Sequence, residues 1–278
     1  MDDREFDDEN PVLSSSALSA LREFYAERDA REKQFEDLKA VAEQKHDATT
    51  KQAPLTMDAF AEDWNESQFW VRICSPLLLQ IAGVGDSGLV TGKYSDETAS
   101  ALAEELLVGA GAGTSIAVVS APSVFVQLKN RLAASDQEED EKPKLWLLEF
   151  DRRFEVFPEF VFYDFNDPLK LPPYLEASID HIICDPPFLS EDCQTKAAMT
   201  VRWLSKSWGV APEKRATDSR LIQCTGERME TLINRLYRAQ GIATTTFEPA
   251  HLKGLSNEFC CYANFECNIW KWKTPSRP

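Results

Sequence analysis

The sequence predicts an α/β fold built on one seven-stranded, mainly parallel sheet, and two features support this. After Trp64, short runs rich in β-branched and aromatic residues alternate with helix-favouring stretches, as in a parallel sheet covered by helices on both faces. The last two runs are separated only by a loop, too short for a crossover helix, so the last strand is expected to run antiparallel. The 278-residue chain is long enough for one such domain with an appendage.

Each expected strand is a short apolar run bounded by turn-forming residues, and each expected helix carries apolar side chains three or four positions apart. This helical spacing is clearest at Met229, Leu232, Ile233 and Leu236. The strands are expected at residues 115–121, 144–151, 160–165, 179–185, 219–225, 242–247 and 259–266. The helices are expected at residues 96–108, 123–134, 193–204 and 227–240.

Residues 1–53 are expected to form an acidic tail and a helical extension outside the main domain, which occupies residues 54–278. Between residues 14 and 46 the chain is charged, free of glycine and helix-favouring, with a discontinuous apolar stripe. A solvated surface helix and a substrate-docking arm both fit this pattern.

The formal net charge of −16 argues against a surface that follows nucleic-acid phosphates, because such surfaces concentrate Lys and Arg. It favours a basic partner, such as a basic protein substrate. The N-terminus is acidic and lacks the order of a signal peptide, and no apolar stretch approaches the length of a membrane span. We therefore expect a cytoplasmic protein without a membrane or a direct nucleic-acid partner.

Seven cysteines are present, and no two of them form a Cys-x-x-Cys pair. Only three histidines could supplement them as metal ligands. Buried intracellular thiols explain this odd set better than a zinc site or a disulfide framework does. No metal is therefore expected.

Polar residues follow the first four expected strands, at the edge where an open α/β sheet binds its ligand. A carboxylate after the second strand can accept hydrogen bonds from both hydroxyls of a ribose, and Glu149 and Asp151 both qualify because they share one face. Asp164 and Asn166, after the third strand, could bind an adenine amino group and ring nitrogen. Each residue alone also fits a turn or helix cap, but four such segments in register favour a ligand site.

The fourth strand ends in Asp185-Pro186-Pro187-Phe188. Neither proline has an N–H to extend the hydrogen-bond ladder, so the tetrapeptide presents a carboxylate, free carbonyls and one flat ring. Those groups can bind an amino nitrogen. A strand-end turn with a capping aspartate is the structural alternative. Asp180 and His181, earlier in the same strand, are expected to pack or form hydrogen bonds rather than to catalyse.

The tetrapeptide resembles that of amino-directed methyltransferases, which include adenine-N6 enzymes and some lysine enzymes. Its companion motifs, spread over residues 60–266, resemble those of the lysine methyltransferases of translation elongation factor 1-alpha, a family once described as adenine-N6 DNA methyltransferases. These motifs are Ser67-Gln68-Phe69-Trp70, Tyr94-Ser95, Val119-Ser120-Ala121-Pro122-Ser123, Glu149-Phe150-Asp151-Arg152-Arg153-Phe154, Phe162-Tyr163-Asp164 and Asn257-Glu258-Phe259.

The resemblance implies a Rossmann-like methyltransferase sheet in residues 54–278, S-adenosyl-L-methionine as cofactor and elongation factor 1-alpha as protein substrate. It implies catalytic roles for Asp185, Pro186, Pro187 and Phe188. The implied cofactor contacts are Phe69, Trp70, Tyr94, Ser95, Ser120, Pro122, Glu149, Asp151, Asp164 and Asn166. Two alternatives stay open, an adenine-N6 nucleic-acid methyltransferase and an inactive methyltransferase-like binding protein.

The chain departs from the family pattern at two places. Ser120-Ala121-Pro122-Ser123 stands where many cofactor-binding sheets have a glycine-rich loop, as it also does in the family. Residues 71–93 separate Trp70 from Tyr94, whereas family members run Phe-Trp-Tyr-Ser without a break. The glycines of this insert do not match a dinucleotide-binding fingerprint, because its third glycine is misplaced.

We predict that residues 71–93 are a translated intron. Every Val codon begins with GT and one Lys codon ends with AG, so Val71 and Lys93 fit the two splice borders. A genuine surface loop is the competing interpretation, since long insertions close at modest entropic cost. Sequencing the transcript should give a spliced message that joins the codons of Trp70 and Tyr94. Reads that all retain the insert would establish the loop instead.

Overall fold

The computed structural model describes residues 55, 57, 94–208, 210, 219–251 and 259–273. The expected N-terminal extension, the insert at 71–93, and the predicted contacts Phe69 and Trp70 lie outside the described residues.

The described elements alternate between strands and helices, as predicted. The strands are β1 (Ser115–Val119), β2 (Lys144–Glu149), β3 (Phe160–Phe162), β4 (His181–Cys184), β5 (Arg220–Gly226), β6 (Ala243–Thr244) and β7 (Phe259–Ala263). The α-helices are α4 (Asp96–Leu107), α5 (Pro122–Ala134), α6 (Glu191–Leu204) and α7 (Glu230–Leu236). Short 3-10 helices are η2 (Glu139–Glu141), η3 (Arg152–Val156), η4 (Pro173–Leu175), η6 (Glu227–Met229) and η7 (Arg238–Gln240).

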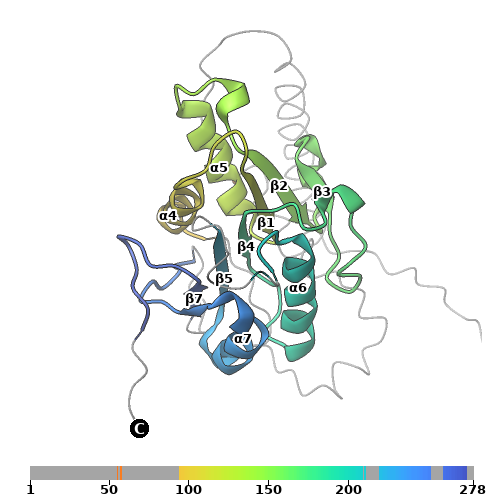
Figure 1. The fold of residues 1–278 in the computed structure, drawn as a ribbon, viewed down its shortest axis with the longest axis vertical. Coiled ribbons are helices and arrows are strands. Elements are labelled where there is room, and N and C mark those ends of the chain that lie inside the picture. Colours follow the sequence, from red (N-terminus) through yellow and green to blue (C-terminus); the bar gives the residue numbers. More distant parts are fainter. Residues whose placement is uncertain are drawn as a thin grey trace, which may run out of the picture. The chain divides into compact units, whose positions relative to one another are not determined.

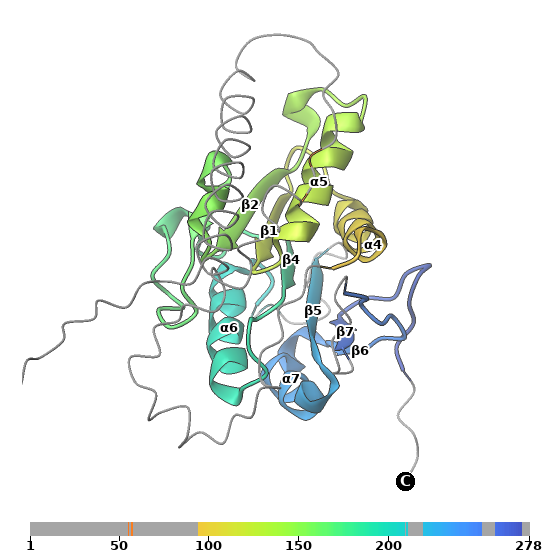
Figure 2. The same cartoon turned by 180° about the vertical axis from the view of Figure 1, so that it is seen from behind.

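The seven strands form one sheet in the order β3-β2-β1-β4-β5-β7-β6 (Figures 1 and 2). The first five strands are parallel, and β7 runs antiparallel to both β5 and β6. This confirms the prediction of a seven-stranded α/β sheet with an antiparallel last strand. The chain order reverses between β1 and β4, which pair directly, and such a switch point is where open sheets bind ligands.

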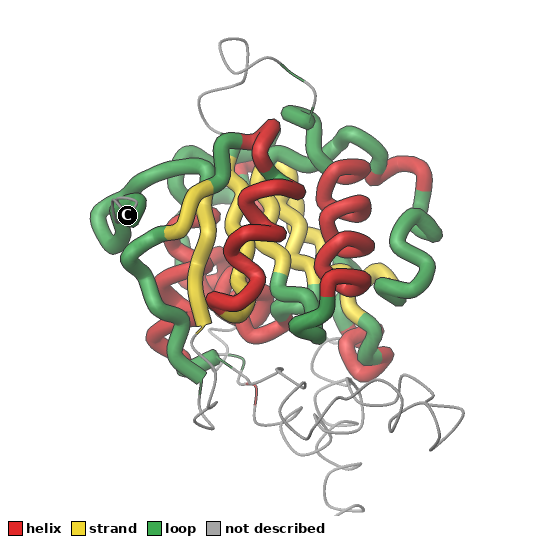
Figure 3. Tube along the Cα trace, turned by 90° about the horizontal axis from the view of Figure 1, so that it is seen from below, coloured by secondary structure: helices red, strands yellow, loops and turns green. Residues whose placement is uncertain are grey.

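Helices cover both faces of the sheet, as the view from below shows (Figure 3). The alternation along β1 explains this arrangement, since successive side chains of a strand point to opposite faces. Ile116 and Val118 pack in one buried cluster with residues of α4 and α5, whereas Ala117 and Val119 pack in a second cluster with residues of α6 and α7. All four side chains are fully buried, which fits a central parallel strand.

The segment expected as one helix at 227–240 is divided into η6, α7 and η7. Between the last two, Tyr237 has φ −104° and ψ 11°, outside the helical range, while its hydroxyl donates to Gln223 Oε1 at 3.1 Å inside the core. Gly241 then ends the segment with a left-handed φ of 71°. Tertiary packing of Tyr237 has overridden the helical pattern.

The strand expected at 242–247 is reduced to Ala243–Thr244. Beyond it the chain exchanges hydrogen bonds with the C-terminal segment, through an antiparallel bridge between Thr245 and Trp272 and a bond from Thr246 N to Lys271 O of 2.8 Å. This segment covers the edge that β6 would otherwise expose.

The six cysteines among the described residues are free thiols, and Cys74 lies outside them. Within the same residues, no helix combines the length and apolar character that a membrane span requires.

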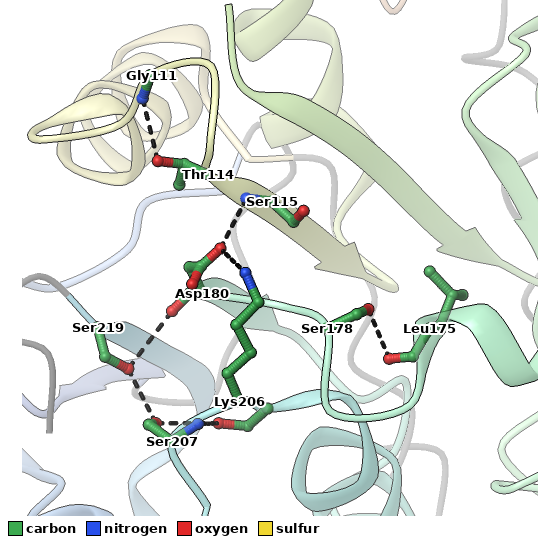
Figure 4. Close-up of polar contacts among 10 residues, drawn as sticks. Gly111, Thr114, Ser115, Leu175, Ser178, Asp180, Lys206, Ser207 and Ser219 are labelled. Carbon is green, nitrogen blue, oxygen red and sulfur yellow. Dashed lines mark hydrogen bonds and ion pairs between the residues drawn. The ribbon is translucent and has the colours of Figure 1, made fainter.

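Asp180 and His181 have structural roles, as the sequence predicted. The Asp180 carboxylate accepts from Ser115 N at 2.9 Å and from Lys206 Nζ at 2.6 Å, which joins the amino ends of β1 and β4 to the chain after α6 (Figure 4). Asp180 N also donates to Ser115 O at 2.9 Å. The buried His181 ring lies with Nδ1 2.7 Å from Leu106 O.

Asp180→Ala should lower the free energy of unfolding by roughly 1–3 kcal/mol, because the Ser115 N–H loses its acceptor and Lys206 its partner. Lys206→Met removes only a half-exposed ion pair and should cost less than about 1 kcal/mol. Urea denaturation of both variants measures the difference. Equal losses would show that the ion pair, not the backbone bond, is the important interaction.

Candidate active site

The carboxyl ends of β1 to β4 meet at one edge of the sheet. Asp185 N donates to Val119 O at 3.0 Å, Ser120 N to Leu148 O at 2.9 Å, and Tyr163 N to Glu149 O at 3.0 Å. These bonds continue the parallel ladders one residue past each strand. The four segments predicted to form a crevice therefore lie at the ends of adjacent strands.

The turn from β1 into α5 has a left-handed residue where a glycine would ordinarily be expected. Ser120 has φ 55°, and Pro122 follows at the first position of α5. A non-glycine residue in this region costs on the order of 1–3 kcal/mol, and such strain concentrates at functional sites. Ser120 and Pro122 thus make the sharp turn without the usual glycine.

Asp185 is buried at the end of β4, with only 8% of its surface exposed. The Tyr94 hydroxyl donates to its Oδ2 at 2.7 Å, whereas Oδ1 is buried and has no hydrogen-bond partner among the described residues. Burial raises the pKa of Asp185 to about 8; the Tyr94 bond lowers it, and the nearby charge of Glu149 raises it further. The free oxygen can accept a bond from a ligand.

Glu149, the last residue of β2, is likewise a buried carboxyl with one oxygen that has no partner among the described residues. Its Oε1 accepts from Phe150 N at 2.8 Å and Asp151 N at 3.2 Å, and its Oε2 is buried without a partner among the described residues. Burial is the main cause that raises its pKa to about 7. Buried acceptors without donors are costly, and perturbed carboxyls at a strand-end crevice mark a site for a donor-rich or cationic ligand.

Asp151 is engaged within its own turn. Its Oδ2 accepts from Arg153 Nε at 2.9 Å and Nη2 at 2.6 Å, and its Oδ1 accepts from Arg153 Nε and from Arg153 N, which caps η3, both at 3.0 Å. A fork-shaped ion pair of this kind uses both oxygens. Of the two acids that the sequence could not separate, only Glu149 has an oxygen without a partner in the part of the chain that the structure describes.

The remaining predicted contacts lie at local turns. Asn166 donates to Asp164 Oδ1 from its backbone N at 2.8 Å and from Nδ2 at 3.0 Å, beyond the edge strand β3. Ser95 is the N-cap of α4 and accepts from Thr98 N at 3.2 Å. Ser95 N donates to Ala250 O at 2.8 Å, so both its hydroxyl and its backbone N–H are already engaged.

Two further residues near the tetrapeptide were not predicted. Gln194, fully buried on α6, donates from Nε2 to Phe188 O and to Thr225 Oγ1, both at 3.0 Å. Phe165 meets Phe188 edge-on, with 5.5 Å between ring centroids. Gln194 thereby ties the tetrapeptide to β5, and the two rings form an aromatic wall. Neither residue carries a sequence signal, because both contacts depend on how α6 and the loop after β3 pack.

No group of three or more His, Cys, Asp or Glu side chains in the described part of the chain is arranged to hold a metal ion. The acids at the strand ends, Glu149 and Asp185, are instead two separate carboxyls with one unpartnered oxygen each. This pair suits an organic ligand with hydroxyl or amino groups.

Comparison with known proteins gives consistent matches. The family model described as "Probable N6-adenine methyltransferase" matches residues 93–267. Protein-lysine N-methyltransferase EFM5 of Saccharomyces cerevisiae is 39% identical over 94% of this chain and 94% of its own. EEF1A lysine methyltransferase 1 is 37% identical in Gallus gallus, over 95% of this chain and 98% of its own, and 35% identical in Homo sapiens, over 95% and 96%.

These similarities extend over nearly the whole of each relative, and they confirm the resemblance found in the sequence motifs. The adenine description of the family model also agrees with the earlier naming of that family. The strand order and the buried Asp185 agree with these relatives. The chain therefore belongs to the family of the elongation factor 1-alpha lysine methyltransferases.

Proposed function

We propose that this chain is an S-adenosyl-L-methionine-dependent protein-lysine N-methyltransferase that acts on translation elongation factor 1-alpha. The observation that carries the proposal is the buried carboxylate of Asp185, whose Oδ1 has no partner among the described residues, at the end of the central strand β4. The relatives named as lysine methyltransferases of elongation factor 1-alpha support the choice of substrate.

The crevice has the groups that this cofactor requires. When bound, S-adenosyl-L-methionine supplies an electrophilic methyl group on a positively charged sulfur. Glu149 would accept the ribose hydroxyls through its unpartnered Oε2, and Asp164 would lie toward the adenine at the end of β3. The turn at Ser120 and Pro122 would hold the amino-acid end. A nearby positive charge would stabilise the ionised forms of Glu149 and Asp185, whose pKa values are about 7 and 8.

Asp185 would hold the substrate amine. A free lysine ammonium has a pKa of about 10.4 and no lone pair, so the site must favour its neutral form by desolvation and proton loss. The neutral amine would donate one N–H to Asp185 Oδ1 and another to Pro186 O, which directs its lone pair away from both. Alignment of this kind supplies much of the rate gain in a displacement.

The aromatic wall fits the rest of the lysine side chain. Phe188 would pack on the aliphatic stem and, through its ring face, on the cationic product. Phe165 meets the same ring at 5.5 Å and narrows the pocket around it. Pro187 would keep the turn rigid between the carboxylate and the ring.

The acidic balance of the chain supports a protein substrate over a nucleic acid. A net charge of −16 repels phosphates and speeds the encounter with a basic partner. Free cysteine thiols and a translation-factor substrate support a cytoplasmic location. An adenine-N6 activity, which the family model's description names, is the alternative that the experiment must separate.

Purified protein with radiolabelled cofactor should transfer label to elongation factor 1-alpha and not to adenine-containing DNA or RNA. Asp185→Ala should reduce this transfer on the order of 100-fold or more, the scale for loss of a group placed at the reacting atoms, while cofactor affinity is largely kept. Label in nucleic acid alone, or normal turnover by the variant, would overturn the assignment.

Glu149→Gln should weaken cofactor affinity about tenfold or more, because a hydrogen bond to a charged group is worth about 1.5–3 kcal/mol. Asp151→Asn is the matched control: it disturbs the Arg153 pair, and affinity should stay within about threefold, well below the effect of a lost charged bond. Calorimetric titration of S-adenosyl-L-methionine measures both. A larger loss in Asp151→Asn would assign the ribose to that residue.

A further inference from the structure

We propose that Tyr94 is a positioning residue of the acceptor site, whose hydroxyl holds one oxygen of Asp185 so that the other stays directed at the substrate amine. The inference rests on the proposed function. It places Tyr94 on the acceptor side of the site, whereas the family resemblance implied a cofactor contact.

The hydrogen bond between Tyr94 and Asp185 is direct and buried. Tyr94 is 1% exposed and Asp185 8% exposed, and their oxygens lie 2.7 Å apart although the residues are 91 positions apart in the chain. A carboxylate oxygen that already accepts a bond from a phenol cannot rotate away without losing it. With Oδ2 occupied, Oδ1 is the oxygen left for a second donor, and it has none among the described residues.

Tyr94 is itself held by the chain that follows β6. It forms an isolated antiparallel bridge with His251, and Ser95 N donates to Ala250 O at 2.8 Å. The Tyr94 ring lies 4.9 Å from the His251 ring, which packs edge-on against Phe259 of β7 at 4.6 Å. The start of α4 and the chain after β6 therefore hold the phenol in place. A hydroxyl held by packing on two sides gives its acceptor one defined direction.

The pKa values of the two groups keep the Tyr94 phenol as the donor and the Asp185 carboxyl as the acceptor. Burial, with Asp185 as a further cause, raises the pKa of Tyr94 well above its ordinary value, so the phenol remains a donor. Burial lowers the pKa of His251 to about 4, so its ring is neutral at physiological pH and adds no charge beside the phenol. When the pair loses a proton, the negative charge therefore lies on Asp185, whose pKa of about 8 is the lower of the two.

Several titratable groups face this pair from the surrounding elements. They are Glu149 at the end of β2, Cys184 of β4, Cys193 of α6 and Cys224 of β5, together with His251 against the phenol. Burial raises the pKa values of Cys184 and Cys193, and the neighbouring Cys261 thiol, with burial, raises that of Cys224, so all three stay neutral near pH 7. Glu149 raises the pKa of Asp185, and the bond from Tyr94 opposes this.

Loss of the Tyr94 hydroxyl should therefore raise the pKa of Asp185 above its value of about 8. The carboxylate is needed in its ionised form to accept from the amine, so activity rises with pH as Asp185 loses its proton. In Tyr94→Phe this rise should move to higher pH by about one unit, the equivalent of a bond of about 1.4 kcal/mol. At pH 7 we expect kcat to fall about tenfold, while the KM for cofactor is little changed.

The test measures kcat and KM of Tyr94→Phe between pH 6 and 10, with elongation factor 1-alpha as substrate. Tyr237→Phe is the matched control, because it also removes one buried hydroxyl, which donates to Gln223 Oε1 at 3.1 Å rather than to Asp185. It should lose stability without any shift of the pH profile. Equal losses of kcat in both variants with unshifted profiles would reduce Tyr94 to a general packing role and overturn the proposal.

A second measurement does not depend on the substrate. Carbon-13 carboxyl NMR of the free protein, with the Asp185 signal assigned by Asp185→Asn, should show a higher titration midpoint in Tyr94→Phe. If Tyr94→Phe does not fold, 3-fluorotyrosine at position 94 keeps the ring, strengthens the donor and should lower the midpoint. An unchanged midpoint would overturn the proposal, whereas absence of methyl transfer by the unaltered protein would overturn only the proposed function.

Discussion

The site depends on the burial of one carboxylate, that of Asp185, at the end of the central strand. A buried carboxyl is expensive to ionise, and the cost is tolerable only where donors are already in place. The strand ladder places the Asp185 backbone through its bond to Val119, and the two prolines that follow end the ladder there. The carboxylate is thus left at the edge of the sheet, with the phenol of Tyr94 as its donor.

Glu149, like Asp185, is a buried carboxyl that is costly to ionise. They end strands on either side of β1, and each carries one buried oxygen without a partner in the described part of the protein. The charge of Glu149 raises the pKa of Asp185, so ionising one makes ionising the other harder. A ligand that brings hydroxyl donors to one and an amine to the other relieves both costs. The strain at Ser120, between them in strand order, belongs to the same edge.

The sequence predicted the strands well, because each central strand is a short apolar run with a polar residue where it ends. It was less reliable where tertiary contacts decide the structure. Glu149 and Asp151 share a face by their spacing, but the chain turns into η3 after Glu149, and Arg153 then binds Asp151. An arginine two residues beyond an acid is a signal that could have separated them. The contact between Tyr94 and Asp185 joins residues 91 positions apart, which no local pattern shows.

The position of the insert gives this long-range contact a further meaning. The contacts of Tyr94 described above, to Asp185 and His251, come from residues that follow it in the chain. Among the described residues, the acceptor half of the site is therefore built from residue 94 onward, whether residues 71–93 are a loop or a translated intron. Of the predicted contacts, Phe69 and Trp70 are the two that precede the insert, and both belong to the predicted cofactor set. An inactive, binding-only protein would then have lost cofactor contacts while the carboxylate, its phenol and the aromatic wall stayed in place.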